Sequence, residues 1–328
     1  MIVKFISKIV NFNLSDLFSL FLYIFSISSM TAVYIIYINI NNITSINNAM
    51  SITAFVVLLG LTAILINIIA VYNRTITDHP RALSIALVGP PNAGKTVYLT
   101  MLYKELETKE IEGLSFSPYG SRTIEVVARN IARMEQGEFP PPTPMESSFR
   151  YEAVASFSRR FITQKYRIQI SDYAGEHLKE FDDADEMWLH HTDYFEYVVS
   201  ADALLFMLDC ETLLNGDSIP HLQSILVATV HTFIERRRSD PTKPSDVPVA
   251  LLFSKSDVLS SKEDIEKITS QVSRLIAVCK KRFRYFRYFL VSSVGVTPKE
   301  FNDKGDPIPP PDMEPIGVVE PLIWLLGK

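Results

Sequence analysis

The residues best suited to chemistry are Gly89, Gly94, Lys95 and Thr96, spaced as G-x-x-x-x-G-K-T between an apolar, strand-like run and a helical pattern. A strand, a tight loop and a helix N-terminus bind phosphate, because loop amides point inward and the helix end is partially positive. Lys95 would bridge the β- and γ-phosphate oxygens, and the Thr96 hydroxyl would ligate Mg²⁺. The flanking elements disfavour the alternative, a glycine turn with a chance lysine. The loop residues expected to contact a nucleotide are Gly89, Pro90, Asn92, Ala93, Gly94, Lys95, Thr96 and Val97.

A second signal is acidic. Asp172 ends an apolar, strand-like run, and Gly175 follows three residues later in the pattern D-x-x-G. The carboxylate would hold Mg²⁺ through a water molecule, and the amide of Gly175 could meet a γ-phosphate. The pattern alone is common, but its place after a strand and downstream of a phosphate loop makes it informative.

A third stretch fits the recognition of a base. The apolar run 249–253 ends in Ser254, Lys255, Ser256 and Asp257. In the pattern N-K-x-D, the aspartate accepts hydrogen bonds from guanine N1 and N2, and the lysine stem lies on the face of the base. Ser254 stands where that pattern has asparagine, so we expect one structural hydrogen bond to be weaker.

Adenine lacks the pair of N–H groups from which Asp257 would accept hydrogen bonds, so this residue favours guanine. Ser254, which departs from the guanine pattern, leaves an ATPase as an alternative. A last strand-like run leads into Ser292-Ser293-Val294-Gly295. A backbone amide at Ser293 or Val294 could contact guanine O6.

The elements that must position these residues begin at Arg81, where strand-like and helical patterns start to alternate. This alternation predicts an α/β domain with helices on both faces of a mostly parallel sheet. One strand is expected to be antiparallel, because a short connection separates the strands at 148–157 and 161–171. The other strands are expected at 83–88, 203–209, 249–253 and 285–291, and the helices at 95–108, 121–136, 187–200, 219–238 and 316–326.

The helix at 121–136 shows an apolar stripe of residues three or four apart. It is expected to bury Ile124, Val127, Ile131 and Met134. The basic and aromatic stretch 280–289 would suit single-stranded nucleic acid or anionic lipid. We expect instead a helix end that leads into an alternating strand.

Composition sets the class of protein. The 328 residues suffice for one large domain or two small ones, and the net charge of −5 gives no sign of nucleic-acid binding. The two cysteines, Cys210 and Cys279, form no disulfide framework or zinc pattern. His190 and His191 beside Asp193 could ligate a metal, but an ordinary helix surface explains them better.

The N-terminal region has the hydropathy of a membrane hairpin. The segments 17–40 and 52–72 carry no charged residue, and each reaches the roughly 20 residues that cross a bilayer. Lys4 and Lys8 precede the first segment, Arg74 and Arg81 follow the second, and the loop between the segments is uncharged. Because positive residues favour the cytoplasmic side, this pattern predicts that both termini lie in the cytoplasm. The expected organisation is an amphipathic segment at 1–13, a transmembrane α-hairpin at 14–72, a linker at 73–80 and a nucleotide-binding domain at 81–328 with an inserted helix at about 121–136.

Taken in order, GPPNAGKT, DYAG, SKSD and SSVG resemble the Ras-like (TRAFAC-type) P-loop GTPase superfamily over residues 82–328. The helix at 121–136, the FPPPT loop and the closing VVEPLIWLL are similar to bacterial GTPase domains of the double-GTPase type. The resemblance implies a P-loop NTPase fold, a Ras-like G domain, with GTP or GDP as ligand and Mg²⁺ as cofactor.

Carried over to this chain, the resemblance gives Lys95, Gly175 and Glu176 catalytic roles. It gives Mg²⁺ the ligands Thr96, Asp172 and a first-switch threonine, for which Thr143 is our choice and Thr123 the alternative. It assigns the base to Ser254, Lys255, Asp257, Ser293 and Val294.

Two positions depart from the family. Glu176 stands where Ras-like enzymes place the glutamine that orients the attacking water, so this carboxylate either acts through a water or leaves hydrolysis slow. Pro91 stands at a position that is glycine in Ras itself, which affects the access of an arginine finger from a partner.

The sequence therefore predicts a membrane-anchored GTPase switch at the cytoplasmic face of the inner membrane. Its partners would be a guanine nucleotide, the lipid bilayer and an unidentified effector or activator protein, and no nucleic acid. A non-hydrolysing nucleotide-binding scaffold of a membrane complex, and an ATPase, are the alternatives.

Overall fold

The computed structural model describes residues 57–68, 80–141, 149–159, 162–172, 193–216, 219–237, 243–303 and 305–328. The chain divides into two compact units, Met1–Pro80 with Ser158–Lys165, and Arg81–Phe157 with Tyr166–Lys328. The second unit contains almost the whole of the sheet described below.

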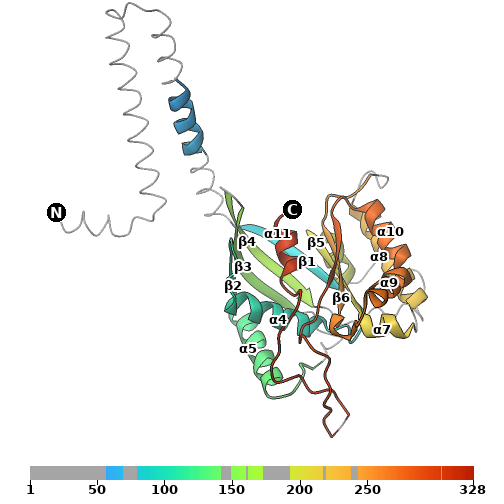
Figure 1. The fold of residues 1–328 in the computed structure, drawn as a ribbon. Coiled ribbons are helices and arrows are strands. Elements are labelled where there is room, and N and C mark those ends of the chain that lie inside the picture. The colour runs from blue at the N-terminus through green and yellow to red at the C-terminus, as the bar shows by residue number, and fades with distance from the viewer. Residues whose placement is uncertain are drawn as a thin grey trace, which may run out of the picture. The chain divides into compact units, whose positions relative to one another are not determined.

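Seven strands form one sheet in the order β2-β3-β4-β1-β5-β6-β7 (Figure 1). Register is parallel for β1 with β4 and β5, for β5 with β6 and for β6 with β7, and antiparallel for β2 with β3. The predicted α/β class, with a mostly parallel sheet, is confirmed. The strands are β1 Arg81–Val88, β2 Leu114–Pro118, β3 Phe149–Arg159, β4 Ile162–Asp172, β5 Ala203–Asp209, β6 Val249–Ser254 and β7 Phe286–Leu290.

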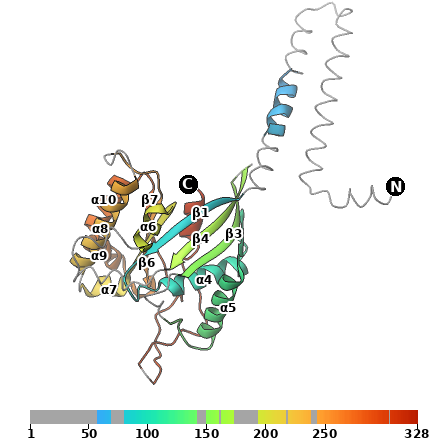
Figure 2. The ribbon, with the colours of Figure 1, turned by 180° about the vertical axis from the view of Figure 1, so that it is seen from behind.

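Helices cover both faces of the sheet, because each central strand sends alternate apolar side chains to opposite sides. Ile85 and Leu87 of β1 pack in one cluster, and Ala86 and Val88 pack in the other. The first cluster includes α4 Lys95–Thr108, α5 Ser121–Glu135 and α11 Glu320–Leu326; the second includes α6 Asp193–Ser200, α7 Cys210–Asn215, α8 Ile219–Arg237, α9 Lys262–Gln271 and α10 Ser273–Arg282. Figure 2, seen from behind, brings α6 in front of the sheet, whereas α11 lies in front in Figure 1.

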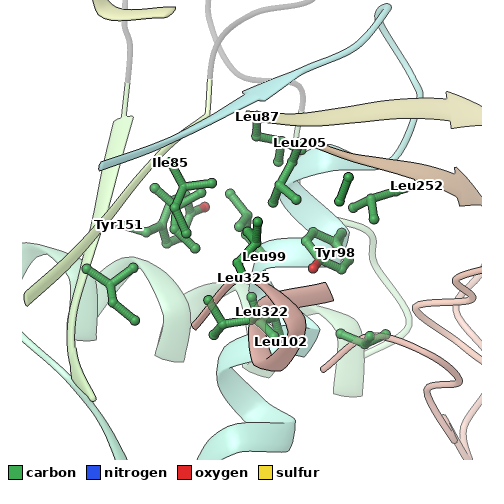
Figure 3. Packing of buried hydrophobic residues seen from close by; sticks show 14 of the residues in the cluster. Ile85, Leu87, Tyr98, Leu99, Leu102, Tyr151, Leu205, Leu252, Leu322 and Leu325 are labelled. Atoms are coloured by element: carbon green, nitrogen blue, oxygen red, sulfur yellow. The ribbon is translucent and has the colours of Figure 1, made fainter. Parts of the chain in front are cut away.

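The closing helix α11 completes the first cluster. Leu322 and Leu325 lie beside Leu99 and Leu102 of α4, under the strand residue Leu205 (Figure 3). The apolar C-terminal segment therefore packs on the sheet, as the sequence predicts, although the helix begins at Glu320 and not at 316.

The helix α5 begins at Ser121 as predicted and ends at Glu135, one residue before the predicted end, but its buried face differs from the predicted one. Val127 and Met134 are buried, together with the polar Thr123 and Asn130, whereas Ile124 is 51% exposed. The stripe prediction is thus wrong at Ile124. The polar pair replaces it because both side chains find hydrogen bonds inside, Thr123 Oγ1 with the amide of Glu152 and Asn130 Nδ2 with Thr100 Oγ1.

The strand β2 was not predicted. Its sequence, LSFSP, is short and contains a proline, and it forms the edge of the sheet against β3. A short edge strand needs only one partner and only partial burial, so it leaves a weak apolar pattern. The stretch 280–289 contains the predicted helix end and strand, α10 followed by β7, although the burial along β7 does not alternate.

Of the predicted membrane hairpin, only residues 57–68 lie within the described residues. They form a helix most of whose large apolar side chains are exposed; Leu58, Leu61 and Leu65 are 57–60% exposed. Among the described residues, no helix combines the length and the apolarity needed to cross a bilayer. The segments 1–13, 17–40 and 73–79, and residues 52–56 and 69–72 of the second apolar segment, lie outside the described residues.

Candidate functional site

The predicted site residues that the structure describes lie at one edge of the sheet. Strands β1, β4, β5 and β6 run parallel, so their carboxyl ends meet at this edge. The residues at those ends are Val88, Asp172, Asp209 and Ser254, and the phosphate loop continues directly from Val88. Ligands of open α/β sheets bind outside the carboxyl ends of the strands.

The phosphate loop is held tightly against β5. A Cβ added to Gly89 would lie 2.5 Å from the backbone oxygen of Met207, so no larger residue fits there without a backbone shift. The loop then turns through two left-handed residues, Asn92 with φ of 60° and Gly94 with φ of 84°. This path leads the chain into α4 at Lys95.

Lys95 folds back over its own loop. The side chain is buried, with 7% exposure, and Nζ lies 2.8 Å from the carbonyl oxygens of both Gly89 and Pro90. These contacts hold the ammonium group at the mouth of the loop. Thr96 follows in the first turn of α4, where the partial positive charge of the helix is greatest.

Ser254 joins the base-recognition segment to the phosphate loop. Its hydroxyl is buried and lies 2.7 Å from the carbonyl oxygen of Ala93 and 3.2 Å from that of Leu208. One hydroxyl carries one donor hydrogen, so it serves these two carbonyls in turn. The link expected from an asparagine is therefore kept, with one donor where the amide would supply two.

Lys255 is fixed by an acidic neighbour. It adopts φ of 51°, in the left-handed region, where the chain turns sharply from β6 into the short 3₁₀ turn η5 Ser256–Val258. Its Nζ lies 2.7 Å from Asp209 Oδ2 and 3.6 Å from Glu211 Oε2. Asp209 also caps α7, because its Oδ1 accepts a hydrogen bond from the Glu211 amide at 2.9 Å.

Asp257 is oriented by the loop that follows β7. Ser292 Oγ donates to Asp257 Oδ1 at 2.5 Å, and Thr297 Oγ1 donates to Oδ2 at 2.9 Å. The amide of Gly295 donates in turn to Ser292 Oγ at 2.9 Å. The stretch Ser292-Ser293-Val294-Gly295 is thus connected to the base-recognition segment.

The backbone of Asp172 pairs with Leu87, two residues before Gly89, so the strand end reaches the start of the phosphate loop. Thr143, Gly175 and Glu176 lie outside the described residues. The alternative switch threonine, Thr123, is buried in α5 with 3% exposure. Its Oγ1 accepts a hydrogen bond from the backbone amide of Glu152, so it is a structural residue.

Metal and thiol chemistry are limited in the parts of the chain that the structure describes. There, no three His, Cys, Asp or Glu side chains gather to hold a metal ion. Burial, with the nearby Asp209, raises the pKa of the Cys210 thiol to about 12, and burial raises that of Cys279 to about 12. Neither cysteine is a nucleophile at neutral pH.

Sequence reasoning missed Asp209, Ser292 and Thr297 as residues that orient the site. Asp209 had a signal, since it is the one charged residue at the end of the apolar run ALLFMLD. Ser292 and Thr297 are ordinary polar residues of a loop, and only the fold reveals their contact with Asp257.

Comparison with known proteins gives a match to a family. The sequence model of "Double-GTPase 2" matches residues 83–299. The chain is also 26% identical over 213 residues to the "Putative ESX-1 scaffolding and assembly protein SaeC" of Mycolicibacterium smegmatis, over 56% of this chain and 49% of that protein. The chain thus spans about half the length of this curated relative.

Two solved structures resemble the chain at low similarity. One is the Arl6 BBS3 small GTPase from Trypanosoma brucei with a bound nucleotide analogue, with a TM-score of 0.38 and 16% identity, covering 75% of this chain and 96% of that one. The other is the signal recognition particle receptor SRb-GTP/SRX complex from Chaetomium thermophilum, with a TM-score of 0.37 and 15% identity, covering 67% and 94%.

Proposed function

Since the chain belongs to the Double-GTPase 2 family, we propose that it is a membrane-anchored protein that binds GTP with Mg²⁺ and hydrolyses it as a molecular switch. The observation that carries the proposal is the Ser254–Ala93 hydrogen bond, because it joins a base-recognition segment to a phosphate loop. A nucleotide lying along this edge of the sheet would contact both segments at once.

The phosphate end of the site suits an anion. The loop amides and the start of α4 supply partial positive charge, and Lys95 supplies a full one. Its partners include two neutral carbonyl oxygens at 2.8 Å, and a phosphate would offer it a stronger, charge-assisted contact.

The base end of the site suits guanine. A carboxylate held by two hydroxyl groups is fixed in direction, so Asp257 can accept from the N1–H and N2–H of guanine. Adenine offers no such pair of donors. This arrangement disfavours the alternative of an ATPase, which rested on Ser254.

Magnesium would be held by Thr96, Asp172 and Thr143, whose hydroxyl and carboxylate oxygens are the hard ligands that this ion prefers. The backbone places Asp172 beside β1 and Thr96 in the first turn of α4, both at the phosphate end. When bound, the ion would neutralise negative charge on the phosphate oxygens.

Hydrolysis would depend on Lys95, which stabilises charge on the transferred phosphoryl group, and on Gly175 and Glu176. Glu176 would orient water less well than glutamine, so we expect slow turnover without an activator. The test is phosphate release from GTP by the full chain in non-ionic detergent, beside Lys95→Ala and, as a control, Lys104→Ala. Lys104 lies on the same helix and pairs with Glu135 at its surface.

Release that persists in Lys104→Ala and disappears in Lys95→Ala supports the switch. GTP binding without release favours the second candidate, a nucleotide-binding scaffold that does not hydrolyse GTP. The name of the mycobacterial relative, a scaffolding and assembly protein, favours this candidate. Absence of any nucleotide binding contradicts both.

Membrane anchoring rests on the uncharged segments 17–40 and 52–72 and on the exposed apolar side chains of residues 57–68. We place the protein in the inner (cytoplasmic) membrane, with both termini and the nucleotide site on the cytoplasmic side. Ser45→Cys in the connecting loop should then react with a membrane-impermeant maleimide that is added to spheroplasts, in which the inner membrane is intact. Ser260→Cys in the domain should react only after lysis; the opposite pattern contradicts the orientation.

A further inference from the structure

The strand β7 is the last strand of the sheet, and its outer edge is open at Phe286 and Tyr288 among the described residues. Beyond them the edge is covered, because Ser292 pairs with Ile316 and Gly317 lies against the carbonyl of Leu290. The amide of Val291, just after β7, donates to the carbonyl oxygen of Phe253 in β6 at 2.9 Å. In a parallel pair, alternate residues turn both backbone groups toward the same neighbour. Counting back from Val291, Phe286 and Tyr288 turn their N–H and C=O groups away from β6, and no described residue hydrogen bonds to them.

A cleft lies beside Phe286 and Tyr288 at this edge. It has a volume of about 350 Å³ and is lined by Lys280 of α10 and by Phe286, Arg287 and Tyr288 of β7. Tyr288 is 42% exposed, and its ring packs at 5.8 Å from that of Phe253. A helix beside an open strand edge is the setting in which extended peptides add to a sheet.

The cleft is basic. Lys280, Lys281 and Arg287 have no carboxylate within ion-pair distance among the described residues, whereas the nearby Arg284 pairs with Asp246 at 2.8 Å. The guanidinium of Arg287 lies 5.0 Å from the centre of the Phe289 ring, which holds it at the edge of the sheet. Positive charges on an edge strand repel a second copy of the same edge, so this surface selects against self-pairing.

We propose that the β7 edge is a docking site for an acidic, extended segment of a partner protein, which adds to the sheet as an eighth strand. The partner backbone pairs with Phe286 and Tyr288. Its apolar side chains on one face contact these two aromatic rings beside Lys280 of α10, and its carboxylates on the other face lie beside Arg287, which shares that face of β7 with Phe289. An anionic lipid surface fits less well, because it offers no donors and acceptors in register with the strand edge.

The test uses a fluorescein-labelled ten-residue peptide of alternating glutamate and valine, titrated with the full chain in non-ionic detergent. We expect saturable binding that weakens at least about tenfold in the double variant Lys280→Glu with Arg287→Glu, since like charges across an interface repel. Arg274→Glu, an exposed charge at the other end of α10, should leave the affinity within about twofold.

A pair of variants at Tyr288 separates the backbone from the side chain. Tyr288→Pro removes the outward N–H, which an edge strand tolerates, and Tyr288→Ala removes the ring alone. Binding should fall further in the proline variant than in the alanine variant. Circular dichroism melting checks the fold of each.

Several outcomes overturn the proposal. These are no saturable binding, an equal loss in Arg274→Glu, and equal binding by the proline and alanine variants. The fourth is tighter binding of short-chain phosphatidylglycerol that is lost in the same double variant, because this result would assign the surface to anionic lipid.

Discussion

The hydroxyl of Ser254 lies 2.7 Å from the carbonyl oxygen of Ala93, across 161 residues of sequence. Both residues are buried, so no solvent can replace this hydrogen bond. The contact makes the positions of the phosphate loop and the base-recognition segment depend on each other. A serine in place of the asparagine of the N-K-x-D pattern therefore keeps the connection on which a bipartite nucleotide site depends.

Ser254→Ala should weaken both folding and nucleotide binding. It leaves the buried Ala93 carbonyl without its donor, which costs about 1–3 kcal/mol. Ser254→Asn, unlike Ser254→Ala, should keep nucleotide binding, because the asparagine amide has two donor hydrogens for the carbonyl oxygens of Ala93 and Leu208. Calorimetric titration with GDP measures the affinity of each variant, and thermal melting measures its stability. Ser256→Ala, whose hydroxyl has no such contact, is the control; an equal loss there would argue against the link.

Gly89→Ala should abolish nucleotide binding and lower the melting temperature. The added Cβ would meet the Met207 carbonyl oxygen at 2.5 Å, so the loop must move away from β5. Gly327→Ala is the matched control, since its Cβ would meet nothing closer than 3.5 Å. If Gly89→Ala binds GDP as the parent does, the loop is not the phosphate site.

Ser292→Ala should reduce the preference for guanine over hypoxanthine, which lacks the N2 amine. The change frees Asp257 Oδ1 and leaves the Gly295 amide without its acceptor, so the carboxylate loses its fixed direction. We expect about a tenfold smaller ratio of the GDP to IDP affinities, the equivalent of about 1.4 kcal/mol. Thr297→Val, which removes only the contact to Oδ2, should have a smaller effect. A larger effect at Thr297 would reverse the roles given to the two hydroxyls.

The two cysteines should resist thiol reagents in the folded protein. Burial raises the pKa of Cys210 and of Cys279 to about 12, so the reactive thiolate is scarce at pH 8. Because the folded pKa lies above the unfolded one, raising the pH through the ordinary thiol range favours the unfolded state. Mass spectrometry after iodoacetamide should find no label at pH 8 and two labels after unfolding. Rapid labelling of Cys210 in the native protein would contradict its burial.

Much of the fold could be predicted, because central strands and the phosphate loop have strong local patterns. The run ALLFMLD is buried at every position and reads as a strand from sequence alone. The helix α4 begins at Lys95 and ends at Thr108, as the sequence predicts. By contrast, the exposed side of Ile124 depends on how α5 rotates against α4, which its own pattern does not determine.

The candidate site could be predicted as residue types but not as contacts. The motifs identify Lys95, Ser254 and Asp257, since their spacing is local. The partners of these residues come from distant loops: Lys255 meets Asp209, and Asp257 meets Ser292 and Thr297. Such pairs depend on strand order, which a single sequence does not specify.

The most direct test of the central claim is a change of base specificity at Asp257. The full chain and Asp257→Asn are titrated with GDP, ADP and xanthosine diphosphate in the presence of Mg²⁺. We predict that the parent prefers GDP and that Asp257→Asn prefers xanthosine diphosphate, because the amide donates where the carboxylate accepts. Unchanged GDP affinity in Asp257→Asn, or a parent that binds ADP as well as GDP, would contradict the guanine site.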